Sequence, residues 1–280
     1  MSADAAKRIL TQRLESLARA GVQQIGRVPP PSPTPHPVGE GGRKPGAGRQ
    51  AATLSPESPM PKSARPVPLL ADSGSLLRQP YPAPLPTIAD RQTALEEQRC
   101  QVAACQLCPV LVRNRSKTVY GVGTAAPRVA FFGEAPGADE DRQGEPFIGR
   151  AGQLLTKIIE ACGWQRSDVY IMNTLKCRPP DNRTPAPDEL ANCRPFWERQ
   201  LEILQPEFIV CAGGVAAQAL LETTESVGKL RGRFHKYRGS TVLVTYHPSY
   251  LLRNPDAKKY VWDDMKKLLK EMGLPVPGRG

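Results

Sequence analysis

The stretch that decides the fold lies between Gly133 and Leu155 and reads GEAPGADEDRQGEPFIGRAGQLL. The residues before it, Arg128–Phe132, have the length and apolar composition of a buried strand. The residues at its end, Gln153–Cys162, have the apolar spacing of an amphipathic helix. A loop that leads from a strand into a helix lies at the carboxyl edge of a parallel sheet, where open α/β sheets bind ligands. The stretch therefore predicts a ligand-binding loop.

This loop does not have the pattern of a nucleotide-phosphate site. No Gly-Lys-Ser/Thr sequence closes it, and it does not fit Gly-x-Gly-x-x-Gly. Four acidic residues argue further against a bound polyphosphate: Glu134, Asp139, Glu140 and Asp141.

Apolar runs and amphipathic runs alternate along the rest of the chain. Three further strands are predicted at Val169–Leu175, Phe208–Ala212 and Thr241–Tyr246, and helices are predicted at Thr93–Cys105, Asp188–Leu204, Val215–Leu221 and Lys258–Met272. This alternation predicts a single α/β domain, residues 88–275, with a central four-stranded parallel sheet flanked by helices. Because parallel strands end at one edge, we expect Glu134, Asn173 and His247 to converge there.

The first part of the chain differs in composition. Residues 1–21 have the apolar spacing of a short amphipathic helix. Residues 22–87 contain sixteen of the thirty prolines, interspersed with Gly, Ser, Arg and Lys, and are expected to form a disordered linker. We expect this tail to contact DNA or a protein partner that the sequence does not identify.

The net charge of +11 favours a polyanionic partner such as nucleic acid. The sequence contains no apolar run long enough to span a bilayer, and its first residues do not have the pattern of a signal peptide. We therefore expect a cytoplasmic protein, associated with the nucleoid and not with a membrane. The basic charge and the single compact domain favour a monomer.

The seven cysteines favour metal or cluster ligation over a disulfide framework, because the chain shows no export signal. Cys105 and Cys108 form a ligand-type pair, and Cys177 and Cys193 follow in polar contexts. The other three are Cys162 and Cys211, which lie in apolar runs, and Cys100. Four thiolates suit either zinc or an iron–sulfur cluster, and spacing alone does not choose between them.

Taken together, these segments resemble the iron–sulfur uracil-DNA glycosylases, usually called family 4. The resemblance rests on the Gly133–Leu155 stretch, on Asn173 with the following KCRPPDNRTP, on the spacing of the four cysteines, and on HPSYLLRNP beginning at His247. It covers about residues 98 to 272. It implies the fold of that superfamily and a [4Fe-4S] cluster held by Cys105, Cys108, Cys177 and Cys193, with Cys100 a spare thiol.

The resemblance also implies an activity, the release of uracil from single- or double-stranded DNA by hydrolysis of the N-glycosidic bond. The flipped uracil would be bound by Glu134, Ala135, Pro136, Glu140, Phe147, Asn173 and His247. The Asn173 amide complements N3–H and O4 of uracil but opposes both groups of cytosine. Phe147 would stack on the base, and Glu140 would exclude the thymine methyl group.

The catalytic groups implied are His247, which would donate a hydrogen bond to uracil O2, and a carboxylate that orients water. Ala135 stands where the best-known glycosylases of the superfamily carry Asp, so Glu134 and Glu140 are both candidates for the carboxylate, with Asp141 third. The residues expected to contact DNA are Arg231, Arg233 and Arg253 at phosphates, and Leu251 or Leu252 as the wedge that fills the vacated stack.

Two other functions remain open on the sequence alone. One is a DNA-binding module of the same fold that captures uracil sites covalently through His235 without turnover. The other is a zinc- or cluster-bearing nucleic-acid adaptor recruited through the tail. The first predicts an adduct that resists SDS, and the second predicts salt-dependent binding without base release.

Overall fold

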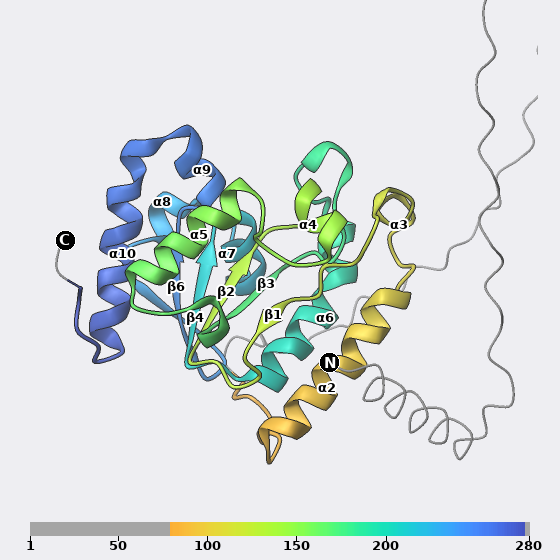
Figure 1. Cartoon of the computed structure of the whole chain (residues 1–280), viewed down its shortest axis with the longest axis horizontal. Coiled ribbons are helices and arrows are strands. Elements are labelled where there is room, and N and C mark those ends of the chain that lie inside the picture. The colour runs from red at the N-terminus through yellow and green to blue at the C-terminus, as the bar shows by residue number, and fades with distance from the viewer. Residues whose placement is uncertain (1–78, 278–280) are drawn as a thin grey trace, which may run out of the picture. The chain divides into compact units, whose positions relative to one another are not determined.

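The structure is a computed structural model, and it describes residues 79–277. A six-stranded sheet with strand order β1-β3-β2-β4-β6-β5 forms its centre (Figure 1). Four central strands are parallel: β2 (Val129–Gly133), β3 (Tyr170–Asn173), β4 (Phe208–Ala212) and β6 (Ser240–Thr245). β2, β3 and β4 are buried throughout, as expected for strands covered on both faces. The predicted α/β fold with a parallel four-stranded core is confirmed.

Two antiparallel edge strands complete the sheet, and the sequence did not predict them. β1 (Val122–Gly123) pairs with β3, and β5 (Phe234–Tyr237) pairs with β6. β1 has only two residues, too few for any periodicity to be recognised. β5 is only partly buried and contains His and Lys, so it has no apolar run.

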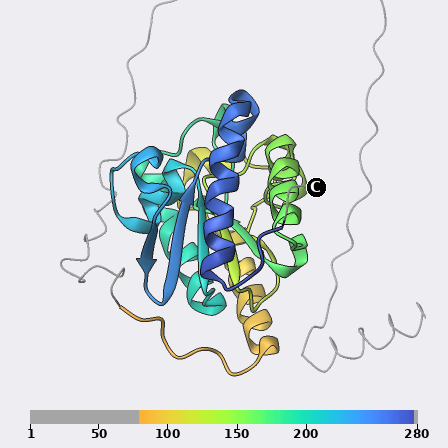
Figure 2. The ribbon, with the colours of Figure 1, turned by 90° about the vertical axis from the view of Figure 1, so that its left-hand side faces the viewer.

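Helices cover both faces of the sheet, as Figures 1 and 2 show. On one face, α5 (Arg150–Ala161) and α10 (Lys258–Glu271) enclose a core that includes Phe131, Ile159 and Met265. On the other face, the helices are α2 (Ile88–Ala104), α6 (Pro187–Leu204) and α7 (Gly214–Leu221), and their core includes Phe132 and Trp197. The sheet therefore has an apolar core on each side.

Short helices lie in the connections: α3 (Pro109–Asn114), α4 (Ala138–Gln143), α8 (Val227–Leu230) and α9 (Pro248–Arg253). α4 lies within the long loop that was expected between β2 and α5. It ends at Gln143 and is capped by Gly144, whose φ of 82° is the left-handed conformation that glycine adopts without steric cost. α9 follows β6 directly and begins after His247.

Residues before 88 already pack against the domain. The Tyr81 hydroxyl is 2.9 Å from Ser240 Oγ, and its ring lies 6.4 Å from that of Tyr237. Burial raises the pKa of Tyr81 to about 12. Thr87 then caps α2 in a capping box with Asp90. The helix expected at residues 1–21 and most of the linker expected at 22–87 lie outside the described residues.

Candidate active site

The carboxyl ends of β2, β3 and β6 meet at a pocket of about 290 Å³. The seven residues expected to bind uracil all line it: Glu134, Ala135, Pro136, Glu140, Phe147, Asn173 and His247. They come from segments more than a hundred residues apart, which the parallel order of the strands brings to one edge. Gly137, Ala151, Pro179, Asn182, Arg183 and Ser249 complete the lining.

Asn173 is the last residue of β3 and is paired with Gly133 of β2. It is only 2% exposed, yet its Oδ1 has no hydrogen-bond partner within residues 79–277. Leaving a buried amide oxygen without a donor costs about 1–3 kcal/mol. An acceptor left open in this way at the wall of a pocket is suited to a ligand N–H.

The Phe147 ring closes the pocket beside Asn173. A Cβ at Gly133 would collide with both Asn173 Oδ1 and the Phe147 ring, so only glycine leaves these side chains in place. Phe147 itself has φ 52°, an uncommon conformation for a large residue. Arg166 stabilises this turn by donating to the carbonyl oxygen of Phe147 at 3.1 Å.

His247 caps α9, and its environment fixes its protonation. The backbone N–H of Ser249 donates to His247 Nδ1 at 3.1 Å, so Nδ1 is the acceptor and the ring proton lies on Nε2. Burial, with a smaller effect from Arg253, lowers the pKa of His247 from 6.5 to about 4. The ring is therefore neutral near pH 7, with an Nε2–H available as a donor. It lies 5.5 Å from the Phe147 ring, centroid to centroid.

The three candidate carboxylates have different partners. Glu140 is held by backbone N–H groups: Gly137 N donates to Oε2 at 3.1 Å, and Ile148 N and Gly149 N donate to Oε1 at 3.0 Å. Both oxygens of Asp141 accept from Ser116 N at 2.9 Å, and Asp141 does not line the pocket. The carboxylates of Glu140 and Asp141 therefore stabilise the loop by accepting hydrogen bonds from its backbone.

Glu134 differs because it lines the pocket directly after β2, and burial raises the pKa of its carboxyl group. A carboxylate with a raised pKa in a pocket is a better proton acceptor than a solvated one. The geometry thus favours Glu134 over the other two as the group that acts on water.

Two basic residues at the site were not predicted from the sequence, Arg183 and Lys176. Arg183 lines the pocket and forms a two-point ion pair with the nearly buried Glu189, at 2.6 and 2.9 Å. Lys176 is fully buried and donates from Nζ to the carbonyl oxygen of Asn173 at 3.0 Å. Burial lowers the pKa of Lys176 to about 7. The only signal for these residues was their place in the KCRPPDNRTP motif.

Four thiols line a second, smaller cavity close to Lys176: Cys105, Cys108, Cys177 and Cys193. They are the four residues expected to be ligands, whereas Cys100 is exposed on α2. Within residues 79–277, no three His, Cys, Asp or Glu side chains are arranged so that they could hold a metal ion. The thiols share one cavity but do not converge on a single ion position.

The surroundings of these thiols fit an iron–sulfur cluster. Arg115 Nη1 donates to Cys177 Sγ at 3.1 Å, and the backbone N–H of Lys176 donates to Cys193 Sγ at 3.3 Å. Leu111, Leu175 and Phe196 form apolar walls. Burial raises the pKa of the Cys193 thiol to about 12, so thiolates here require compensating positive charge. N–H donors to sulfur and an apolar shell are features of cluster sites.

The residues expected to contact DNA have unequal surroundings. Leu252 is 39% exposed and Arg253 is exposed beside it, whereas Leu251 is 1% exposed and packs in the core. The exposed position makes Leu252 the better wedge. Arg233 is exposed and lies 3.3 Å from Glu225.

The Arg231 guanidinium already has a partner within the protein, because it forms an ion pair with the fully buried Asp264. His235, the candidate for covalent capture, does not line the pocket. Its Nε2 lies 2.8 Å from the Leu230 carbonyl oxygen. The phosphate contact expected of Arg231 and the covalent capture considered for His235 both stay predictions.

A pocket at the carboxyl edge of a parallel sheet, with an open amide acceptor, a neutral histidine donor and a carboxylate of raised pKa, defines an α/β enzyme site. The family model described as the uracil DNA glycosylase superfamily matches residues 120–268. The type-4 uracil-DNA glycosylase of Thermotoga maritima is 42% identical in an alignment of 181 positions that covers 63% of this chain and 94% of that protein.

Two archaeal proteins with the same name are similar to a comparable degree. The one from Archaeoglobus fulgidus is 39% identical over 63% of this chain and 92% of its own. The one from Sulfurisphaera tokodaii is 39% identical over 62% of this chain and 83% of its own. The chain belongs to the uracil-DNA glycosylase superfamily, as the resemblance indicated, and is a DNA glycosylase, a hydrolase.

Proposed function

We propose that this enzyme hydrolyses the N-glycosidic bond of uracil in DNA, in single and double strands, and leaves an abasic site for base excision repair. The observation that carries the proposal is the open acceptor Asn173 Oδ1 on the wall of the pocket. Because a base inside the duplex cannot reach such a pocket, the nucleotide is flipped out of the stack.

Uracil is selected by hydrogen bonds that only its edge can complete. Asn173 Oδ1 accepts from N3–H, and the amide group donates to O4. Cytosine has an acceptor at N3 and a donor at its amino group, so it would face both groups with the wrong polarity. Lys176 orients the Asn173 backbone by donating a hydrogen bond from Nζ to the Asn173 carbonyl oxygen.

Cleavage of the bond leaves negative charge on uracil, which His247 stabilises. Its Nε2–H donates to uracil O2, and because the ring is neutral it donates without carrying charge of its own. Glu134 orients the attacking water and accepts its proton, and its negative charge stabilises the sugar cation.

Thymine is excluded by bulk at the C5 position. Glu140 takes this role because three backbone N–H groups hold its carboxylate, so it forms a rigid polar wall that does not yield to a methyl group. Phe147 stacks on the face of the base.

We further propose that Cys105, Cys108, Cys177 and Cys193 hold a [4Fe-4S] cluster. When bound, the group supplies a covalent tie between the α2–α3 region and the segment that carries Cys177 and Cys193. Hydrolysis of a glycosidic bond transfers no electrons, so its function here is structural.

The enzyme acts as a monomer on chromosomal DNA in the cytoplasm, associated with the nucleoid, and its tail contacts DNA or a protein partner. No helix within residues 79–277 is long and apolar enough to cross a membrane. The expected DNA contacts are Leu252 as the wedge, with Arg253 and Arg233 at phosphates.

The test is a set of oligonucleotides that differ only in one base, uracil, thymine or cytosine, as single strands and as duplexes. Base release is followed by alkaline strand cleavage, with His247→Gln as the inactive control. We expect release of uracil alone from both forms. Equal release of thymine would overturn the assignment of the pocket, and an SDS-resistant adduct without turnover would indicate covalent capture instead.

A further inference from the structure

Three tyrosines form a continuous aromatic surface next to the pocket. The rings of Tyr246 and Tyr250 stack at 4.9 Å with an interplanar angle of 25°, and the Tyr260 ring meets Tyr246 edge-on at 6.4 Å. Tyr250 is 39% exposed and Tyr260 is 42% exposed. Tyr250 stacks on Tyr246 by one face, and its exposure leaves part of its side chain accessible to a ligand.

This surface is tied closely to the candidate active site. Tyr246 directly precedes His247, and the backbone N–H of Tyr250 donates to the His247 carbonyl oxygen at 2.9 Å. Leu252, the exposed candidate for the wedge, lies on the same short helix as Tyr250. A strand whose target base enters the pocket would therefore bring its neighbouring bases past these rings.

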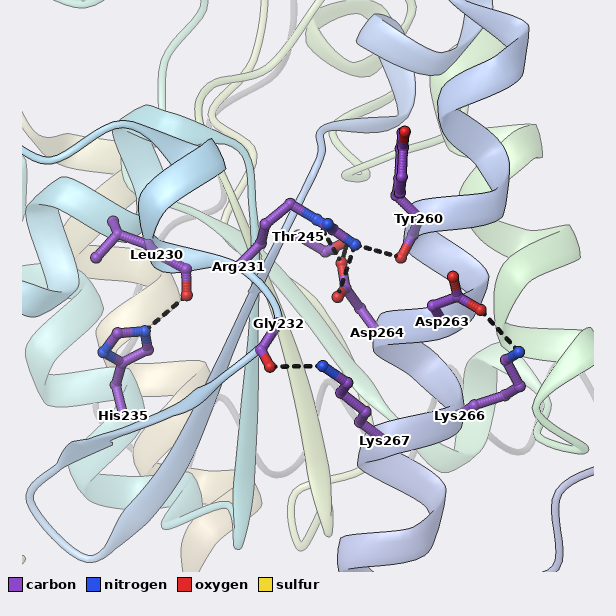
Figure 3. A network of polar contacts seen from close by, with 10 residues as sticks. All are labelled: Leu230, Arg231, Gly232, His235, Thr245, Tyr260, Asp263, Asp264, Lys266 and Lys267. Carbon is purple, nitrogen blue, oxygen red and sulfur yellow. Dashed lines mark hydrogen bonds and ion pairs between the residues drawn. The ribbon is translucent and has the colours of Figure 1, made fainter.

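Arg231 contacts two of the three tyrosines, Tyr246 and Tyr260, and Figure 3 shows its guanidinium between Asp264 and Tyr260. Its guanidinium carbon lies 5.4 Å from the centre of the Tyr246 ring and 5.0 Å from that of Tyr260. It donates to the Tyr260 carbonyl oxygen at 2.7 Å and to Asp264 at 2.9 and 3.1 Å. Thr245, at the end of β6, donates to Asp264 at 2.8 Å. Arg231 thus holds Tyr246 and Tyr260, and Tyr250 packs on Tyr246, which reduces the entropic cost of stacking a base on these rings.

A positively charged hollow of about 380 Å³ adjoins Tyr260. Two of its cations are neutralised, because Lys266 pairs with Asp263 at 2.7 Å and Arg231 pairs with Asp264. Lys267 donates to the neutral carbonyl oxygen of Gly232, and Lys270 adds a further positive charge. An excess of positive charge beside open aromatic rings matches a ligand with alternating bases and phosphates.

We propose that Tyr250 and Tyr260 are a stacking platform for unpaired bases that flank the target uracil on the same strand, with Lys267 and Lys270 contacting its phosphates. The proposal rests on the proposed function and adds to it a binding site for single-stranded DNA. It gives a physical reason for action on single strands, because stacking on aromatic rings replaces the base stacking that a duplex supplies.

The test uses Tyr250→Ala and Tyr260→Ala, with the matched variants Tyr250→Phe and Tyr260→Phe, which keep the ring. Ile88→Ala, which removes another exposed apolar side chain far along the chain on α2, is the control. Single-stranded oligonucleotides carry 2-aminopurine beside the target position, and its fluorescence quenching reports stacking. One set contains uracil and a second set contains none, so binding is measured independently of base release.

Each alanine variant should weaken single-strand binding about tenfold and reduce the quenching, while the phenylalanine variants retain both. The Michaelis constant on single-stranded substrate should rise more than the turnover number falls, and duplex substrate should be affected less. Lys267→Ala and Lys270→Ala should each make the negative slope of log affinity against log salt shallower by about 0.7.

Alanine variants that bind and quench like the wild type would overturn the platform, even in an enzyme that releases uracil normally. If the wild type releases no uracil but quenching still depends on the two tyrosines, the proposed function fails while the platform stands.

Discussion

Replacing Asn173 by Asp changes one donor group in the pocket and keeps the size of the side chain. The amide group that should donate to uracil O4 becomes a carboxylate oxygen, which repels O4. The site is 2% exposed, so water cannot compensate for the lost bond. A buried polar group that is left opposed costs about 3 kcal/mol, which lowers kcat/KM for uracil release by about 150-fold.

The assay compares Asn173→Asp with the wild type under single-turnover conditions on the same uracil-containing oligonucleotide. Gln101→Glu, at an exposed position on α2, adds the same charge away from the pocket and should leave kcat/KM unchanged. Thermal melting should show that Asn173→Asp is folded. If this variant retains kcat/KM within about threefold of the wild type, where the lost bond predicts ~150-fold, the assignment of Asn173 to the uracil edge is refuted.

Three further predictions concern the other groups of the site. Glu134→Gln should abolish turnover but still bind free uracil. Wild-type activity should fall as the pH drops through the pKa of Glu134, which burial raises above the ordinary 4.5. Normal turnover in the variant would exclude Glu134 as the group that acts on water. His247 is protonated below pH 6.5 in the unfolded chain but only near pH 4 in the folded protein, because burial lowers its pKa. The free energy of unfolding should therefore fall by about 3 kcal/mol as the pH drops through that window. Denaturant titrations should find this loss in the wild type and not in His247→Gln. Cys177→Ser should remove the visible absorption of the cluster and lower the melting temperature, whereas Cys100→Ser, at an exposed thiol, should change neither; equal spectra for the two variants would contradict the proposed ligand set.

The parallel core and the pocket could be predicted because both depend on local sequence patterns. Four apolar runs identified the four parallel strands, and the positions of Glu134, Asn173 and His247 just after or at the ends of these strands identified the shared edge. Where buried strands alternate with amphipathic helices, topology follows from few rules.

Other features depend on contacts between distant residues and could not be predicted from local patterns. Leu251 and Leu252 are adjacent and chemically identical, and only packing decides which is exposed. Arg231 is a residue type that commonly binds phosphate, yet its guanidinium is paired with Asp264, a buried carboxylate 33 residues further along the chain. Glu140 could not be distinguished from Glu134 until the backbone N–H groups that hold its carboxylate were known.

Catalytic release of uracil is tested most directly with the full chain, purified anaerobically, and uracil-containing oligonucleotide in excess over enzyme. We expect many turnovers per enzyme molecule, abasic product from single and double strands, and an iron–sulfur absorption spectrum in the same sample. Tight binding of the same oligonucleotide without release of base, by protein that is folded and carries its cluster, would contradict this expectation.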